Sequence, residues 1–109
     1  MNATPPTVSV ASVHEALRDV IDPEFGFNIV DLGLVCDVGI QGGLVDVQIT
    51  MATPDGAAQD YVTAAVEGRL LDLPGVSEVL VEVVSSPAWS SRRMSSVAKA
   101  HFWNRAVGE

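Results

Sequence analysis

The stretch Asp22–Val35, which reads DPEFGFNIVDLGLV, decides how the rest of the chain can fold. A helix cannot easily run through it, because Pro23, Gly26 and Gly33 disrupt helical backbone geometry. It nevertheless carries two phenylalanines and several aliphatic side chains, which is more apolar surface than an exposed loop normally leaves in water. We therefore predict an ordered, turn-rich segment that is anchored in a core and holds four polar side chains in fixed places: Asp22, Glu24, Asn28 and Asp31.

The composition limits both the fold and the partners. The chain has 109 residues, of which 48% are hydrophobic and 18% charged, and this suits one domain with a packed core. Its formal charge of −8 argues against nucleic acid and anionic membranes as partners, because both attract a basic face. The single cysteine, Cys36, cannot form an internal disulfide, and residues 1–10 do not resemble a signal peptide. We expect a cytoplasmic protein.

The N-terminal half predicts a helix followed by a hairpin. Residues 1–11 are small and rich in Pro and Thr, which predicts a flexible start before a single domain at 12–109. Ser12 and Glu15 have the spacing of a capping box, and apolar residues at helical spacing follow until Pro23 ends the helix. Two alternating stretches, 34–40 and 44–51, are separated by the turn sequence QGG and predict an antiparallel pair of strands.

The C-terminal half predicts a helix, a strand and a second helix. Apolar residues at helical spacing over 58–73 predict a helix that ends at the Pro-Gly pair following it. Residues 76–84 alternate like a strand, and residues 94 to about 106 predict a terminal helix. The expected order is α-β-β-α-β-α. This indicates an α+β domain whose mostly antiparallel sheet has its helices packed on one face.

Several stretches of the chain resemble one protein family. Residues 22–24 (DPE) and 26–35 (GFNIVDLGLV) resemble the signature of the PaaD/SufT-like family of metal–sulfur (iron–sulfur) cluster biosynthesis proteins. Residues 50–57 (TMATPDGA) resemble the family's Thr-x-Thr-x-Pro-Gly-Cys-Pro loop. Residues 87–89 and 94–95 resemble its Pro-Pro-Trp and Met-Ser elements. The resemblance implies an accessory role in iron–sulfur cluster assembly or in the maturation of target proteins.

The resemblance also implies where a site would lie. The irregular segments 22–33, 52–57 and 85–93 would meet at one pole of the fold. Ligand-binding residues would then come from all three segments and the adjoining strand end: Asn28, Thr50, Thr53, Asp55, Gly56, Ala57, Trp89 and Arg92. The partner would be a client enzyme, another protein or a small-molecule ligand.

The chain departs from the family pattern where the family has its reactive cysteine. In this comparison the cysteine falls on Gly56 and the proline after it on Ala57. A thiol at a helix N-terminus favours the thiolate that ligates iron, but glycine offers no ligand. The alternating pattern places Cys36 on the apolar face of a strand, as a small buried hydrophobe. We therefore predict no bound metal or cofactor and no role as a cluster carrier.

An alternative hypothesis is a cofactor-free enzyme on the same scaffold. The space beside Gly56 would accept a small organic substrate of a specialised metabolic pathway, and Asp22, Glu24 or Asp31 would act as general acid or base. This requires at least two of these carboxylates and Trp89 in one pocket. Asp22 and Asp31 have an equally good structural interpretation, because short carboxylates bond the backbone of their own turns.

Other candidate residues also have two interpretations. Asp55 can cap the following helix instead of contacting a ligand, and Trp89 can close the core instead of forming a recognition patch with Arg92 and Arg93. Both arginines are expected to be exposed. The two histidines, at positions 14 and 101, are expected at solvated helix positions and not in a metal site.

A third hypothesis is a structural interaction module, for example a homodimer. Phe102 and Trp103 are adjacent in the predicted terminal helix, so they point in different directions and cannot both enter one core. One of them is therefore expected at a subunit contact.

Overall fold

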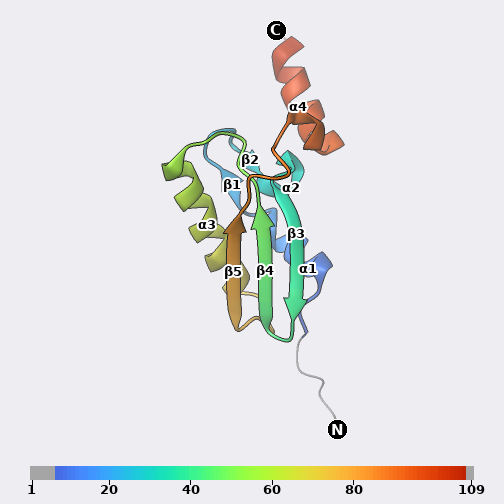
Figure 1. Cartoon of the computed structure of the whole chain (residues 1–109). Helices are drawn as coiled ribbons and strands as arrows, with labels where there is room; N and C mark the ends of the chain where they lie inside the picture. The colour runs from blue at the N-terminus through green and yellow to red at the C-terminus, as the bar shows by residue number, and fades with distance from the viewer. Residues whose placement is uncertain (1–6, 108–109) are drawn as a thin grey trace.

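A computed structural model describes residues 7–107, and side chains as far as Trp103. Figure 1 shows a sheet of three strands, with the terminal helix lying beyond one end of it. The predicted order of the six main elements is confirmed, with short elements added around positions 21–32 and 91–93. In chain order the elements are α1 (Val10–Leu17), β1 (Ile21–Asp22), β2 (Phe27–Asn28), α2 (Ile29–Leu32), β3 (Val35–Gln41), β4 (Leu44–Ile49), α3 (Gly56–Leu71), β5 (Glu78–Val83), the 3-10 turn η1 (Ser91–Arg93) and α4 (Ser96–Val107).

The main sheet has the order β3-β4-β5. β3 and β4 are antiparallel and joined by the predicted turn, where Gln41 pairs with Leu44 and Gly42 adopts a φ of 60°. β5 runs parallel to β4, which it can do because α3 carries the chain back to the start of the sheet. The predicted mostly antiparallel pairing is confirmed, since β1 and β2 also pair antiparallel and β4–β5 is the exception among the described strands.

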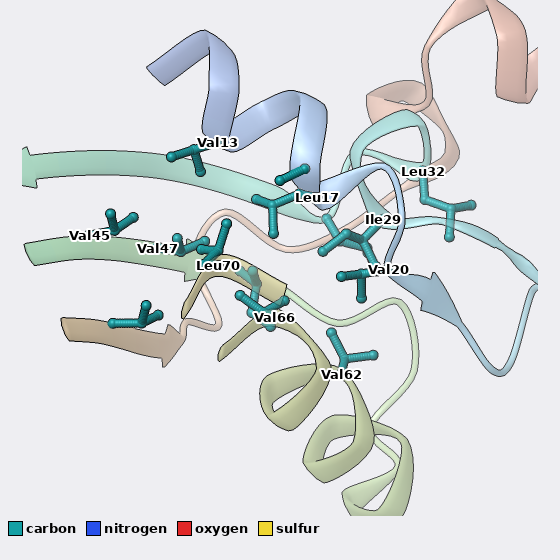
Figure 2. Close-up of a cluster of buried hydrophobic side chains, with 14 residues drawn as sticks. Val13, Leu17, Val20, Ile29, Leu32, Val45, Val47, Val62, Val66 and Leu70 are labelled. Atoms are coloured by element: carbon teal, nitrogen blue, oxygen red, sulfur yellow. The ribbon is translucent and has the colours of Figure 1, made fainter. Parts of the chain in front are cut away.

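The core lies between one face of this sheet and the helices α1 and α3, as Figure 2 shows. Alternate residues of β4 are fully buried, whereas Asp46 between them faces water on the open side of the sheet. Burying each valine or leucine side chain stabilises the fold by about 1.5–3 kcal/mol, before the cost of ordering it. Helices on one face are thus confirmed for α1 and α3. The fully buried contributors from β4, α1 and α3 are Val45, Val47, Ile49, Val13, Leu17, Val62, Val66 and Leu70.

The first helix begins and ends earlier than the sequence pattern predicted. Its N-cap is Ser9, whose side chain accepts from the backbone N–H of Ser12, while the Ser12 hydroxyl accepts from the N–H of Ser9. The predicted Ser12–Glu15 box is therefore wrong, because a serine can serve at the third helical position where glutamate was sought. The helix ends at Leu17. Of the predicted flexible segment 1–11, residues 1–6 lie outside the described part, and the residues from Ser9 onward belong to α1 and its cap.

The central stretch forms a miniature hairpin followed by one helical turn. β1 and β2 pair through Ile21 with Asn28 and Asp22 with Phe27, and α2 follows at once. Asn28 caps α2 by accepting from the backbone N–H of Asp31. Gly33 ends the turn with a φ of 82°, a conformation that L side chains rarely adopt. The prediction of an ordered, turn-rich segment held in the core is confirmed.

A β-bulge at Cys36 corrects the predicted face of this residue. Val35 pairs with Ile49 and Asp37 pairs with Gln48, so Cys36 is the extra residue on β3. Val35 and Val38 therefore face the core, and Cys36 does not share their face. The thiol is only partly buried. The sequence pattern assumes strict alternation along the strand, and the bulge between Val35 and Asp37 breaks that alternation.

The remaining boundaries differ by a few residues from those predicted. α3 begins at Gly56, two residues before the predicted apolar stripe, and ends at Leu71. α4 begins at Ser96, and Val97 in its first turn is 60% exposed although it is apolar. α4 lies against α2 and the pole instead of against the sheet. Its inner side is therefore defined by the loops, which the helical spacing alone does not show.

Candidate functional site

The three irregular segments meet at the end of the sheet where β4 and β5 terminate (Figure 1). The Trp89 indole N–H donates to the carbonyl of Leu32 over 2.7 Å, joining the segment after β5 to α2. The ring of Phe25 lies 5.6 Å from that of Trp89, between centroids. The segment before α3 joins them through Glu24, which lies beside Asp55. The structure thus brings together the segments that the family resemblance placed at one pole.

Asp31 is the centre of a buried hydrogen-bond cluster. Its carboxylate accepts from the Arg18 guanidinium at 2.7 Å, from the Asn28 amide at 2.8 Å and from the Ser95 hydroxyl at 2.7 Å. The backbone N–H of Ser95 also donates to the carbonyl of Asp31 over 2.8 Å. These contacts connect α1, the hairpin and the start of α4. The side chain is therefore a clamp between elements that are distant in sequence.

The charge state of Asp31 supports the same interpretation. Burial by itself would raise the pKa of this carboxyl, because the charged form loses hydration. Hydrogen bonds from Ser95, Asn28 and Arg18, together with the charge of Arg18, outweigh the burial and leave the pKa lowered. A carboxylate that is ionised and accepts three side-chain donors is poorly placed to take a proton from a substrate. The structural interpretation is favoured for Asp31.

Asp22 is almost completely buried, with 1% of its surface exposed. One carboxylate oxygen accepts from the backbone N–H groups of Glu24 (2.7 Å) and Phe25 (3.0 Å), which closes the turn around Pro23. The other oxygen, Oδ2, has no hydrogen-bond partner among the described residues. Asp22 therefore holds the turn as its structural interpretation predicted, and its second oxygen is the polar atom that this role leaves unused.

Glu24 and Asp55 place two carboxyl groups side by side on the surface of the pole. The hydrogen bond with Asp55 raises the pKa of Glu24, and desolvation and the charges of Asp55 and Asp22 raise it further. The pKa of Asp55 is lowered by the same hydrogen bond and by the backbone N–H groups that it accepts at the start of α3. The two shifts oppose each other, so the contact favours the protonated form of Glu24 and the ionised form of Asp55.

The start of α3 has an N-cap and an open position beside it. Asp55 accepts from the N–H of Ala57 at 2.9 Å and of Ala58 at 3.3 Å, which confirms its predicted capping role. Gly56 is exposed, and a Cβ atom added there would meet no atom within 4 Å. The backbone at this position does not require glycine, since its φ is not positive. A Cβ atom would therefore fit at Gly56 without displacing a neighbour.

A second hollow, of about 440 Å³, lies near the same helix start and contains the threonines Thr50 and Thr53. Thr50 is 2% exposed, and its backbone N–H donates to the carbonyl of Leu34 over 2.8 Å. The Thr53 hydroxyl is buried and has no hydrogen-bond partner among the described residues. Gln59 and Ser85 contribute further polar groups to the lining. Thr50 and Thr53, both in the predicted ligand-binding set, therefore lie together, apart from the Glu24–Asp55 pair.

Trp89 and Arg93 tie the last segment to the central stretch. Trp89 is half-buried, and its hydrogen bond to α2 favours the interpretation that it closes the core. Arg93 was expected to be exposed, but it is half-buried and its Nε donates to the carbonyl of Gly33 over 2.8 Å. A Cβ atom at Gly33 would collide with the backbone of Arg93, so only glycine permits this approach. Arg92, by contrast, is exposed as predicted.

The side chains that could ligate a metal are not gathered in one place within the described part of the chain. Among residues 7–107 no group of three or more His, Cys, Asp or Glu side chains has an arrangement that could hold a metal ion. The thiol of Cys36 lies 3.6 Å from the Arg93 guanidinium, a cation that would compete with a metal for the sulfur. Its one thiolate would leave most cluster positions without a protein ligand.

Neither hollow at the pole brings the predicted catalytic carboxylates together with Trp89. The hollow that contains Glu24 is lined by Pro23, Asp55, Tyr61 and the start of α3, and neither Asp31 nor Trp89 lines it. The threonine hollow contains none of the three carboxylates. The arrangement that the enzyme hypothesis required is absent from both hollows, and catalytic roles for Asp22, Glu24 and Asp31 stay predictions without that support.

Three site residues were missed in the sequence. Arg18 and Ser95 hold Asp31 from positions 13 and 64 residues away, and Tyr61 lies on the rim of the Glu24 hollow with 55% of its surface exposed. Tyr61 has the helical spacing of the apolar residues over 58–73, and this pattern favours burial instead of exposure. His101 was expected to be solvated, but its ring lies 4.8 Å from that of Phe27, between centroids.

Most of the chain matches one known protein family. Residues 11–83 match the model of a family described as iron–sulfur cluster assembly protein, and this range includes the central stretch, both threonines of the hollow and α3. The chain belongs to this family. The resemblance seen in the sequence is therefore confirmed.

Two relatives and one solved structure agree with the family match. The chain is 38% identical over 85 residues to the Fe-S protein maturation auxiliary factor YitW of Bacillus subtilis, covering 77% of this chain and 83% of that protein. It is 35% identical over 81 residues to the Fe-S protein maturation auxiliary factor SufT of Staphylococcus aureus, covering 73% of this chain and 92% of that one. A solved DUF59 domain from Bacillus anthracis superposes with a TM-score of 0.80 at 35% identity, covering 85% and 90% of the two chains.

The family match confirms the fold class, because the solved relative shares it over most of both chains. No helix within the described part of the chain combines the length and the apolar character needed to cross a membrane.

Proposed function

We propose that this member of the family is an accessory factor in the maturation of iron–sulfur proteins that acts by contact with a client or carrier protein. The observation that carries the proposal is the start of α3, where Gly56 leaves an open space and no thiol at the position to which the family resemblance assigns the reactive cysteine. The names of the relatives support the maturation role. The cluster is cargo of the process and is bound by the partner.

The proposal predicts a loss of client activity in cells. Deleting the gene should lower the specific activity of [4Fe–4S] enzymes, measured per amount of enzyme protein, while enzymes without a cluster keep theirs. The wild-type chain should restore the activity, and so should the Cys36→Ala variant, because the thiol is not a ligand in this mechanism. Unchanged activity of cluster enzymes in the deletion strain would refute a maturation role.

A reconstitution experiment tests the absence of cluster binding separately. The wild-type chain, mixed anaerobically with ferrous iron and sulfide and then desalted, should retain no cluster absorption. The Gly56→Cys variant is the matched comparison, because its side chain enters open space and should leave the melting temperature nearly unchanged. It should retain more iron than wild type, since a thiol at a helix N-terminus favours the thiolate. Stable cluster absorption in the wild-type chain would contradict the proposed division of roles.

A further inference from the structure

A groove of about 650 Å³ lies beside the C-terminal helix. It is formed by η1 and α4, and its lining is mostly apolar. Figure 1 shows that α4 stands beyond the end of the sheet, where neither the sheet nor α1 or α3 covers it. The side chains used below are Arg92, Met94, Lys99, Phe102 and Trp103.

The aromatic side chains make the groove a firm surface. Phe102 packs on its inner side against Phe25 and Phe27, with ring centroids 5.9 and 5.6 Å apart. This contact holds α4 to the central hairpin. Trp103, the next residue, is 67% exposed and lines the groove. An exposed tryptophan on an anchored helix is the kind of residue that dominates protein interfaces, because it buries a large area at little cost in conformational entropy.

The charges around the groove are opposite in sign to those of the chain as a whole. Net charge is −8, with six Lys and Arg residues in total. Among the cations whose side chains are described, Arg18 and Arg69 pair with aspartates, and Arg93 is bonded to the central stretch. Arg92 and Lys99 form no ion pair within residues 7–103, and both line the groove. The unneutralised positive charge is therefore concentrated beside Trp103.

We propose that this groove binds an acidic amphipathic segment of a partner protein, whose apolar side chains cover Met94 and Trp103 while its carboxylates meet Arg92 and Lys99. Burial of apolar area and charge complementarity both favour binding of such a segment at this site. The rest of the acidic chain repels the same segment, which directs it to the groove. Identification of the partner as a client or carrier of iron–sulfur clusters rests on the proposed function.

The test is an NMR titration of the isotope-labelled full chain. The probe is a synthetic helical peptide with leucine and phenylalanine on one face and glutamate on the other, and the control peptide carries lysine in place of glutamate. The acidic peptide should shift the backbone signals of η1 and α4 and the indole N–H of Trp103, but hardly that of Trp89, which is bonded inward. Binding should weaken as salt rises from about 0.05 to about 0.3 M.

Two variants separate the groove from general electrostatics. Arg92→Ala with Lys99→Ala should weaken binding about tenfold or more, and Trp103→Ala should do the same. The matched control, Gln41→Glu with Ala64→Glu, changes the net charge by the same two units at exposed positions away from the groove and should stay within about twofold of wild type. Unchanged melting temperatures establish that each variant is folded.

Several results would overturn the proposal. Equal effects of the groove variant and its charge-matched control would show that only net charge matters. A wild-type dimer that dissociates in the Arg92→Ala/Lys99→Ala variant during sedimentation would assign the groove to a second copy of this chain. Shifts of the same signals by phosphatidylserine vesicles, with none by the peptide, would assign it to a membrane surface.

The cellular experiment distinguishes this inference from the proposed function. The groove variant should fail to restore [4Fe–4S] enzyme activity in the deletion strain, whereas the Gln41→Glu/Ala64→Glu control should restore it. Restoration by the groove variant would overturn the identity of the partner. If the wild-type chain itself restores nothing, the proposed function fails, while the titration still decides what the groove binds.

Discussion

Replacing Asp31 with asparagine tests whether one carboxylate holds three parts of the chain together. The substitution keeps the size of the side chain and removes its charge. The Asn28 and Ser95 donors lie 2.8 and 2.7 Å from the carboxylate, and Asp31 is only 6% exposed. Each of these two hydrogen bonds loses its charge assistance, which costs about 1 kcal/mol per bond. The Arg18 side chain is 45% exposed, so its ion pair adds no more than about 1 kcal/mol.

The expected loss in free energy of unfolding is therefore roughly 2–3 kcal/mol at neutral pH. For a domain of this size that corresponds to a fall in melting temperature of roughly 10 °C or more. Urea denaturation followed by circular dichroism measures it. Asp46→Asn is the matched control, because Asp46 is exposed on the open face of the sheet, and it should change stability by no more than about 0.5 kcal/mol.

The dependence on pH gives a second readout. The pKa of Asp31 is lowered in the folded chain, so its stabilising contribution is fully present above the ordinary value of 3.8 and is lost as pH falls through the lower folded value. The gap in stability between wild type and Asp31→Asn should therefore be constant at neutral pH and narrow in acid below pH 3.8. If wild type and Asp31→Asn differ in free energy of unfolding by less than about 0.5 kcal/mol at pH 7, or if their difference does not narrow in acid, Asp31 does not hold these elements together.

The other predictions concern the same pole. Gly33→Ala should lower the free energy of unfolding, measured by urea denaturation, by more than about 3 kcal/mol, because the added Cβ meets the backbone of Arg93 at a positive φ. Gly26 also has a positive φ but open space around it, so Gly26→Ala should lower the free energy of unfolding by about 1 kcal/mol. Similar losses for the two glycines would contradict the close approach. Trp89→Phe should lower the free energy of unfolding by about 1 kcal/mol, because an aromatic ring is kept but the hydrogen bond to the carbonyl of Leu32 is lost. An unchanged urea midpoint would show that this hydrogen bond does not stabilise the fold.

Local signals in the sequence predicted most of the secondary structure. The cap at Asp55 and the turn around Gly42 depend only on neighbouring residues, so both could be predicted. The cap of α1 was misplaced by three residues, because Ser9 and Ser12 are both able to cap and the choice depends on how the helix packs. The motif resemblance also predicted that distant loops meet, which periodicity alone could not have shown.

The contents of the site were harder to predict, because they depend on contacts between distant elements. The bulge at Cys36 arises from how β3 pairs with β4, and it turned a residue expected in the core toward Arg93. The sequence allows Trp89 either to close the core or to form a recognition patch, and only its hydrogen bond to α2 favours closing the core. The tryptophan that remains available to a partner is Trp103, which the sequence had flagged only as one of two candidates for a contact.

By itself, the sequence determined the class of the fold, the order of its main elements and membership of an iron–sulfur assembly family, because apolar periodicity, turn residues and motifs are all local properties. Only the tertiary structure decided that β5 runs parallel to β4, that Asp31 is held by Arg18 and Ser95, and that Arg92 and Lys99 flank an exposed tryptophan. Each of these depends on side chains or strands brought together from far apart in the chain, and no spacing within one segment specifies such a meeting.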